Sequence, residues 1–170
     1  GYDLAGIKTK KMQTFIDSMI DASNSDVFNE ALNSLKSLCA EDEVLSGTPF
    51  KHLQNKISTL INGISSNISP SVTISTMHGC PPEEIEAICT YMITEKKLDT
   101  FVKLNPTLLG YDMVRTILDD LGYGYIHLKR ESFEHDLQYE DAIAMIERLV
   151  ALAKRSSRGF GIKLTNTLGS

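Results

Sequence analysis

Four short apolar runs, each ending in a cluster of polar side chains, set the strongest limit on how this chain can fold. The runs and their polar tips are residues 72–75 with 76–81, 101–102 with 103–107, 125–126 with 127–131, and 160–162 with 163–167. Between them, apolar residues recur at helical spacing around positions 85–93, 114–121 and 142–153. Alternation of strand, polar tip and helix is typical of a parallel α/β protein, in which chemistry gathers at the carboxyl ends of the strands. The sequence therefore predicts one active face.

The first third of the chain has a purely helical pattern. From residue 8 to about residue 64, apolar side chains recur at the spacing of one helix face, beginning with Met12, Phe15, Ile16 and Met19. A spacer rich in Ser and Asn follows at residues 65–71. We therefore expect residues 1–64 to be a helical segment that packs on a β/α half-barrel formed by residues 72–170, the two together making one domain.

The length of the chain limits the architecture. A complete eight-stranded barrel needs about 250 residues, whereas this chain has 170. The expected fold class is α/β, a partial TIM-type (β/α) barrel with about four parallel strands and a helical N-terminal segment; an open four-stranded sheet is the alternative. Because the sequence starts without Met and stops at Ser170, directly after its most polar tip, we expect a fragment of a longer chain.

Composition excludes several classes of function. The formal charge of -5 argues against a nucleic-acid surface. No apolar run approaches the roughly 20 residues that cross a bilayer, and no signal peptide is recognisable, so we expect no membrane partner and a cytoplasmic location. The cysteines, Cys39, Cys80 and Cys89, are odd in number and lack C-x-x-C spacing. We therefore expect neither a metal site nor an iron–sulfur cluster in this chain.

Several polar side chains at the predicted tips could carry chemistry. Cys80 lies in the turn before a helix, two residues after His78, and both a helix amino terminus and an imidazole lower the pKa of a thiol. Cys80 is therefore the candidate for proton transfer, with buried packing as the alternative. Asn105, Asn166 and Thr167 offer amide and hydroxyl groups suited to a heterocycle, although they could instead cap loops. The run at residues 129–136 is typical of a solvated loop that could contact an anion or a subunit.

The tips at residues 75–82, 101–107 and 163–167 resemble those of the iron–sulfur subunit of the selenate reductase group, large bacterial oxidoreductases related to dihydropyrimidine dehydrogenase. The resemblance extends along the whole chain. More distantly, the tips are similar to those of the flavin-binding barrel of dihydroorotate and dihydropyrimidine dehydrogenases, which has a Lys-x-x-Pro motif and a Thr-Asn-Thr tip. Lys103 with Pro106, and Thr165, Asn166 and Thr167, match these two motifs.

The resemblance implies a flavin, FMN or FAD, beside Lys103, Asn105 and Lys163. A lysine near the flavin would favour its reduced form; pairing of Lys103 with a carboxylate is the structural alternative.

The remaining tips divide between substrate and catalysis. Thr165, Asn166 and Thr167 would bind the substrate, while Cys80, Thr76 and His78 would form the catalytic set. In the family that the tips resemble, the acid–base residue directly follows a strand-ending Ser. This chain has Thr76 at that position, and Cys80 comes four residues later, so it departs from the family pattern.

The resemblance also implies what lies elsewhere. Iron–sulfur clusters and NAD(P) would bind in other domains of the parent polypeptide, and the flavin phosphate would bind to strands after residue 170, so the fragment alone would be inactive. The implied partners are those other domains and a molybdenum-enzyme subunit.

Three functions compete. The first is a barrel that transfers hydride or electrons to a small substrate within an iron–sulfur flavoprotein oxidoreductase. The second is a non-catalytic structural barrel that docks redox domains or a partner subunit. The third is a Schiff-base enzyme, because Lys103 and Lys163 both end strands and a desolvated amine can be nucleophilic.

Overall fold

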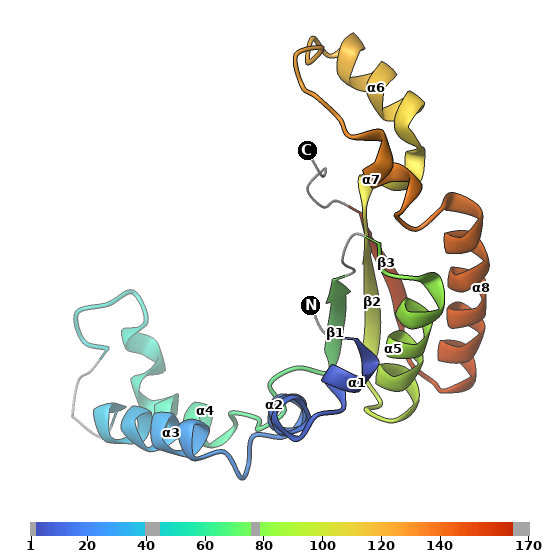
Figure 1. Cartoon of the computed structure of the whole chain (residues 1–170). Coiled ribbons are helices and arrows are strands. Elements are labelled where there is room, and N and C mark those ends of the chain that lie inside the picture. Colours follow the sequence, from blue (N-terminus) through green and yellow to red (C-terminus); the bar gives the residue numbers. More distant parts are fainter. Residues whose placement is uncertain (1–2, 40–44, 76–78, 165–170) are drawn as a thin grey trace. The chain divides into compact units, whose positions relative to one another are not determined.

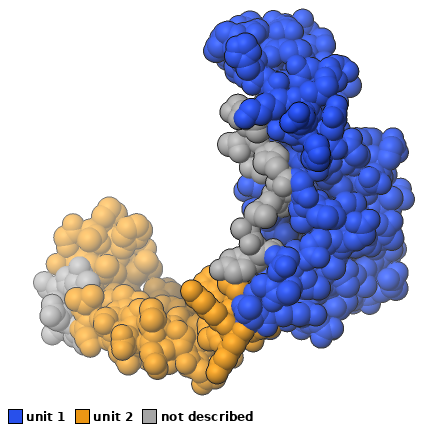
Figure 2. Space-filling view, in the orientation of Figure 1, with its two compact units in different colours: residues 1–9, 70–170 blue, residues 10–69 orange. Residues whose placement is uncertain are grey.

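The computed structural model describes residues 3–39, 45–75 and 79–164. The chain forms two compact units (Figure 2): residues 1–9 with 70–170, and residues 10–69. Within the described ranges, every helix is too short or too polar to span a membrane.

The first unit is built on a parallel sheet. Its strands are β1 (Ser71–Ser75), β2 (Asp99–Leu104) and β3 (Phe160–Leu164), in the order β1-β2-β3 (Figure 1). Helix α5 (Pro82–Thr94) connects β1 to β2. The longer connection from β2 to β3 contains the 3-10 helix η2 (Pro106–Leu109), then α6 (Tyr111–Asp120), α7 (Arg130–Glu134) and α8 (Tyr139–Arg155). The short helix α1 (Leu4–Ile7) contacts α5. The predicted α/β fold with parallel strands is confirmed.

The core of this unit lies between the sheet and the pair α5 and α8. Along β2, the side chains of Thr100, Val102 and Leu104 are buried, as expected for alternate residues on one face of a strand. They pack against apolar faces of α5 and α8, and burial of each large side chain contributes about 1.5–3 kcal/mol. The helix residues of this core are Ile85, Cys89, Ile93, Ala142, Met145, Leu149 and Ala153.

The ends of α5 and α8 follow from the sequence. Pro82 begins α5, where a missing N–H costs nothing, and Glu83 and Glu84 in the first turn complement the helix dipole. A bidentate ion pair then joins the two helices, because Arg148 donates from Nε and Nη2 to the carboxylate of Glu86 at 2.8 and 2.7 Å. This contact lowers the pKa of Glu86 below its usual value.

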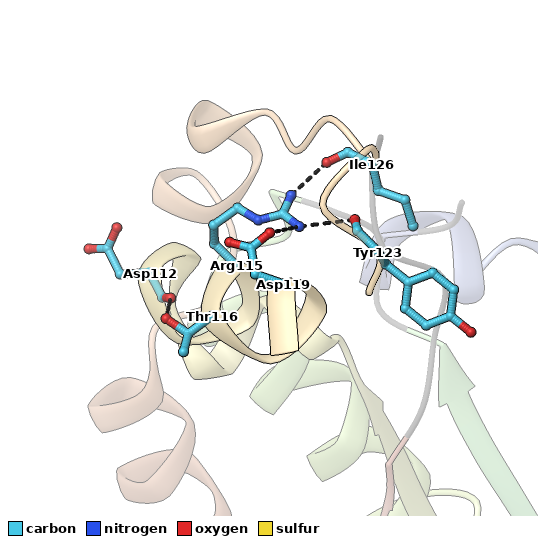
Figure 3. Close-up of polar contacts among 6 residues, drawn as sticks. All are labelled: Asp112, Arg115, Thr116, Asp119, Tyr123 and Ile126. Carbon is cyan, nitrogen blue, oxygen red and sulfur yellow. Dashed lines mark hydrogen bonds and ion pairs between the residues drawn. The ribbon is translucent and has the colours of Figure 1, made fainter. Parts of the chain in front are cut away.

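The predicted strand at residues 125–126 is wrong. Arg115 on α6 donates from Nη1 to the carbonyl of Ile126 at 2.6 Å and from Nη2 to that of Tyr123 at 3.1 Å (Figure 3). The amide of Ile126 also donates to the Tyr123 carbonyl at 3.0 Å, which closes a turn. The amide and the carbonyl of Ile126, which a strand would offer to its neighbours, are therefore already used. The described residues form three parallel strands, not about four.

The second unit is helical. It consists of α2 (Lys10–Ile20), α3 (Asp26–Cys39), the 3-10 helix η1 (Lys51–Lys56) and α4 (Ile57–Asn62). Asn67 donates from Nδ2 to the carbonyl of Ile20 at 2.8 Å, and the amide of Ala22 donates to the carbonyl of Ser66 at 2.8 Å. The end of α2 is thereby fixed to the segment that follows α4.

Candidate functional site

The two predicted flavin-binding lysines, Lys103 and Lys163, lie on neighbouring positions of the sheet. The strand register places Ser75, Lys103 and Lys163 in one row across β1, β2 and β3, one residue from the carboxyl end of β2 and of β3. Alternation along the strands puts this row on the face opposite the helices. Adjacent strands lie about 4.8 Å apart, so both ammonium groups can attract one anionic group. Lys103 is half-buried and Lys163 is exposed.

The next row of the same face carries an aromatic side chain. Thr73, Phe101 and Gly161 are register partners. The ring of Phe101 lies so close to Gly161 that a Cβ there would come within 2.7 Å of ring atoms Cδ1 and Cε1. Phe101 remains 40% exposed. Gly161 is the signal in the sequence that points to this contact, because a glycine inside a strand often marks a close approach by another group.

A buried carboxylate connects two of the strand ends. Asp136 Oδ2 accepts hydrogen bonds from Asn105 Nδ2 at 2.9 Å and from Thr107 Oγ1 at 2.6 Å. Its other oxygen, Oδ1, accepts from the backbone amide of Gly79 at 3.3 Å and from that of Leu137 at 3.1 Å. Asn105, Thr107 and Asp136 are all buried. The loops that follow β1 and β2 thus meet at one side chain.

The run at residues 129–136 is more structured than a solvated loop. Residues Arg130–Glu134 form α7, and Phe133 is buried with its ring edge-on to that of Tyr111, at a centroid distance of 5.5 Å. Arg130 pairs with Asp112 at 2.7 Å. Helix α7 contacts η2, the segment after β2, and Asp136, which follows α7, accepts a hydrogen bond from Asn105 at the end of that strand.

The environment of Cys80 differs from that expected. The Cys80 side chain is half-buried and packs against the core of the unit. Burial raises the pKa of the Cys80 thiol, and the negative charges of Glu84 and Asp136 raise it further. The expectation of a lowered thiol pKa is therefore wrong, because loss of solvent and two nearby carboxylates act on the thiol. Such a thiol keeps its proton near neutral pH, which suits a proton donor better than a nucleophile.

The predicted site residues fall into two groups. Lys103 and Lys163 share the strand-end row, and Asn105 follows it at the end of β2. Among the described hydrogen bonds, a path from Cys80 to Asn105 runs through Gly79 and the Asp136 carboxylate. Thr76, His78, Thr165, Asn166 and Thr167 lie outside the described residues. Sequence reasoning missed Asp136 and Phe101, both of which lie beside predicted residues.

Comparison with known proteins agrees with this architecture. The family model described as "Oxidoreductase YgfK, N-terminal TIM-barrel domain" matches residues 1–170. Two relatives named "Putative oxidoreductase YgfK", from Escherichia coli strains K12 and O157:H7, are each 54% identical over 170 residues. The match covers 100% of this chain but 16% of each relative, so the chain spans about one sixth of their length. No solved structure matches the chain. The family model matches the whole chain, and the described residues form a three-stranded α/β unit. The chain therefore belongs to the family of the N-terminal TIM-barrel domain of the oxidoreductase YgfK.

Proposed function

We propose that the chain is part of a flavin-type barrel that transfers hydride or electrons to a small substrate within a multidomain oxidoreductase. The observation that carries this proposal is the pairing of Lys103 and Lys163 on one row at the carboxyl ends of β2 and β3. The chemistry of these donors fits a flavin, because the ring gains electron density on reduction and two ammonium groups would stabilise it. The proposal also draws on the resemblance to dihydropyrimidine dehydrogenase and to the iron–sulfur subunit of the selenate reductase group.

The residues of the chain have separate tasks in this proposal. Lys103 and Lys163, with the amide of Asn105, would hold FMN or FAD, which supplies the redox chemistry when bound. Cys80, kept as a thiol by its surroundings, would donate a proton to a substrate carbon. Thr76 and His78 would assist it.

The other proposed contacts lie beyond the described site. Thr165, Asn166 and Thr167 would contact the substrate. Electrons would arrive through iron–sulfur clusters and NAD(P) bound by other domains of the polypeptide, with a molybdenum-enzyme subunit as a partner.

The first test measures flavin binding by the complete polypeptide. Lys103→Met and Lys163→Met should each weaken flavin binding by about tenfold, equivalent to roughly 1.4 kcal/mol, and make the flavin midpoint potential more negative because a positive charge is lost. Titration of the deflavinated protein and spectroelectrochemistry measure the two effects. Lys154→Met, on the exposed last turn of α8, is the matched control and should change neither. If the Lys103→Met/Lys163→Met double variant keeps the flavin content and potential of the wild type, the proposal is wrong.

One observation favours a second candidate, a structural barrel that docks redox domains. The thiol of Cys80 packs against the core, as a purely structural cysteine would. In that case the lysine variants should leave the flavin content and every midpoint potential unchanged. Cys80→Ala should then lower the melting temperature without changing the turnover of the complete enzyme. A large loss of turnover in a folded Cys80→Ala variant would exclude this candidate.

A further inference from the structure

We propose that Asp136 is a positioning residue that ties the loop carrying Cys80 to the loop that follows Lys103. The proposal rests on the proposed function in one respect, because it gives Asp136 a part in the chemistry of Cys80. The tie itself stands on the hydrogen bonds and burial of the carboxylate. Asp136 does not belong to any of the strand tips, because it lies between α7 and α8.

The geometry of the tie involves both carboxylate oxygens. Each oxygen accepts two described hydrogen bonds: Oδ2 from Asn105 and Thr107, and Oδ1 from Gly79 and Leu137. Hydrogen bonds to an ionised acceptor are shorter and stronger than neutral ones, in agreement with the 2.6 Å contact from Thr107. A carboxylate is rarely buried without such partners. The side chain is thus placed to hold the two loops and the start of α8 in one arrangement.

The tie reaches the thiol through the backbone. Gly79, the amide donor, directly precedes Cys80 and has a φ of +76°, a conformation that other residues rarely adopt. On the other side of Cys80, the first turn of α5 carries Glu84. Glu84 accepts a hydrogen bond from the backbone amide of Leu4 at 2.5 Å. Among the described residues, Glu84 and Asp136 are the charged groups that act on the thiol, and both disfavour the thiolate.

The test separates positioning from charge by means of three variants of the complete polypeptide. Asp136→Asn removes the charge but keeps the shape. Glu84→Gln removes a charge without touching the tie. Thr107→Val removes one hydrogen bond to the carboxylate, on the β2 side, and leaves the charge in place. Thr94→Val is the matched control, because the Thr94 hydroxyl donates to the Thr90 carbonyl within α5, at 2.9 Å.

Two measurements are made on each variant. Peptide-resolved mass spectrometry follows the alkylation of Cys80 by iodoacetamide across a pH series. Hydrogen exchange follows the amides of residues 79–80 and of the 105–109 segment, in which Pro106 has no amide proton. Neither measurement requires a bound flavin or turnover. A failure of the flavin titration with a positive result here would therefore remove the proposed function and leave the tie.

The expected results differ between the variants. In Asp136→Asn, the alkylation midpoint moves to lower pH, so that alkylation at pH 7.5 is severalfold faster, and both loops exchange faster. In Glu84→Gln, the midpoint moves in the same direction without faster exchange at residues 105–109. In Thr107→Val, exchange becomes faster at Gly79 and Cys80 as well as at the substituted loop. Thr94→Val changes neither measurement.

Two outcomes would overturn the proposal. One is a folded Asp136→Asn variant whose Cys80 alkylation profile matches that of the wild type. The other is a Thr107→Val variant whose faster exchange stops at residues 105–109. If Asp136→Asn does not fold, Thr107→Val decides the matter alone, because coupling across the tie is what the proposal asserts.

Discussion

At the scale of single residues, the contact between Phe101 and Gly161 shows how closely the face opposite the helices is packed. The Phe101 ring occupies the space in which a side chain at position 161 would lie. Since glycine alone leaves that space empty, the two positions are expected to depend on each other. The ring also lies one row below Lys103 and Lys163, so its position affects the surface available beside the lysines.

A double-mutant cycle measures this dependence. Gly161→Ala should destabilise the protein by about 1–3 kcal/mol, because the added methyl group overpacks the site and must displace the ring. In a Phe101→Ala background the same substitution should cost much less, which gives a coupling energy of about 1 kcal/mol. Urea unfolding of the four proteins provides the measurement. Equal costs of Gly161→Ala in both backgrounds would show that the ring moves aside freely.

The position of Lys103 and Lys163 at strand ends was predicted from the sequence, whereas the contacts of Asp136 were not. Lys103 and Lys163 follow recognisable strands, so their placement on one row could be deduced from parallel pairing. Asp136 lies in a polar run, and its hydrogen-bond partners Gly79, Asn105 and Thr107 are 57, 31 and 29 positions away in the sequence. Local sequence contains no information on contacts at such separations. The main cause of the raised pKa of the Cys80 thiol, burial, is likewise a tertiary effect, to which the negative charges of Glu84 and Asp136 add.

At the scale of elements, Arg115 decides the structure of the segment after α6. Its guanidinium bridges the carbonyls of Tyr123 and Ile126 and also pairs with Asp119 at 2.8 Å, all from one side of the helix (Figure 3). Two β-favouring residues at 125–126 were therefore insufficient to form a strand. Helices α5 and α8 could be predicted because their apolar faces repeat over three or more turns, a signal that two residues cannot supply, whereas the short helix α7 was expected to be a loop.

Replacement of Arg115 tests this explanation. Arg115→Lys keeps the charge but lacks the planar fork that reaches both carbonyls, so we expect a loss of about 1–2 kcal/mol in the free energy of local opening. Hydrogen exchange of residues 121–127 should become roughly ten times faster or more. Arg155→Lys, at the exposed end of α8, should leave that segment unchanged. Unaltered exchange in Arg115→Lys would show that the turn is stable without the guanidinium.

At the scale of the whole molecule, the edge strand β3 carries apolar side chains that are largely exposed. Ile162 and Leu164 are in register with Val102 and Leu104, yet they are 45% and 66% exposed, whereas the β2 residues are 0% and 3% exposed. The chain spans 16% of its relatives' length and belongs to a TIM-barrel family. We therefore expect other parts of the complete polypeptide to cover this side of β3.

A conservative substitution can detect that cover. Ile162→Thr should lower the stability of the barrel in the complete polypeptide by about 1–2 kcal/mol, because a side chain buried there would lose apolar contacts. Val150→Thr, on the exposed side of α8 and 50% exposed, should stay within about 0.5 kcal/mol of the wild type. Urea unfolding of each variant, monitored by hydrogen exchange of the β2 amides, measures the change in stability. Equal, small effects would mean that Ile162 faces solvent in the complete protein.

The Asp136 tie also fixes when the site can be assembled during synthesis. Gly79 and Asp136 are 57 positions apart, and a ribosome adds about 5–20 residues per second. The loop that follows β1 therefore exists for roughly three to eleven seconds before its carboxylate partner has been made. During that interval β1 and β2 can pair and α5 can pack on them, but the surroundings of Cys80 are incomplete. The thiol acquires its final environment only after the chain has passed residue 136, so the surroundings of Cys80 cannot form before the carboxylate that joins the two loops has been made.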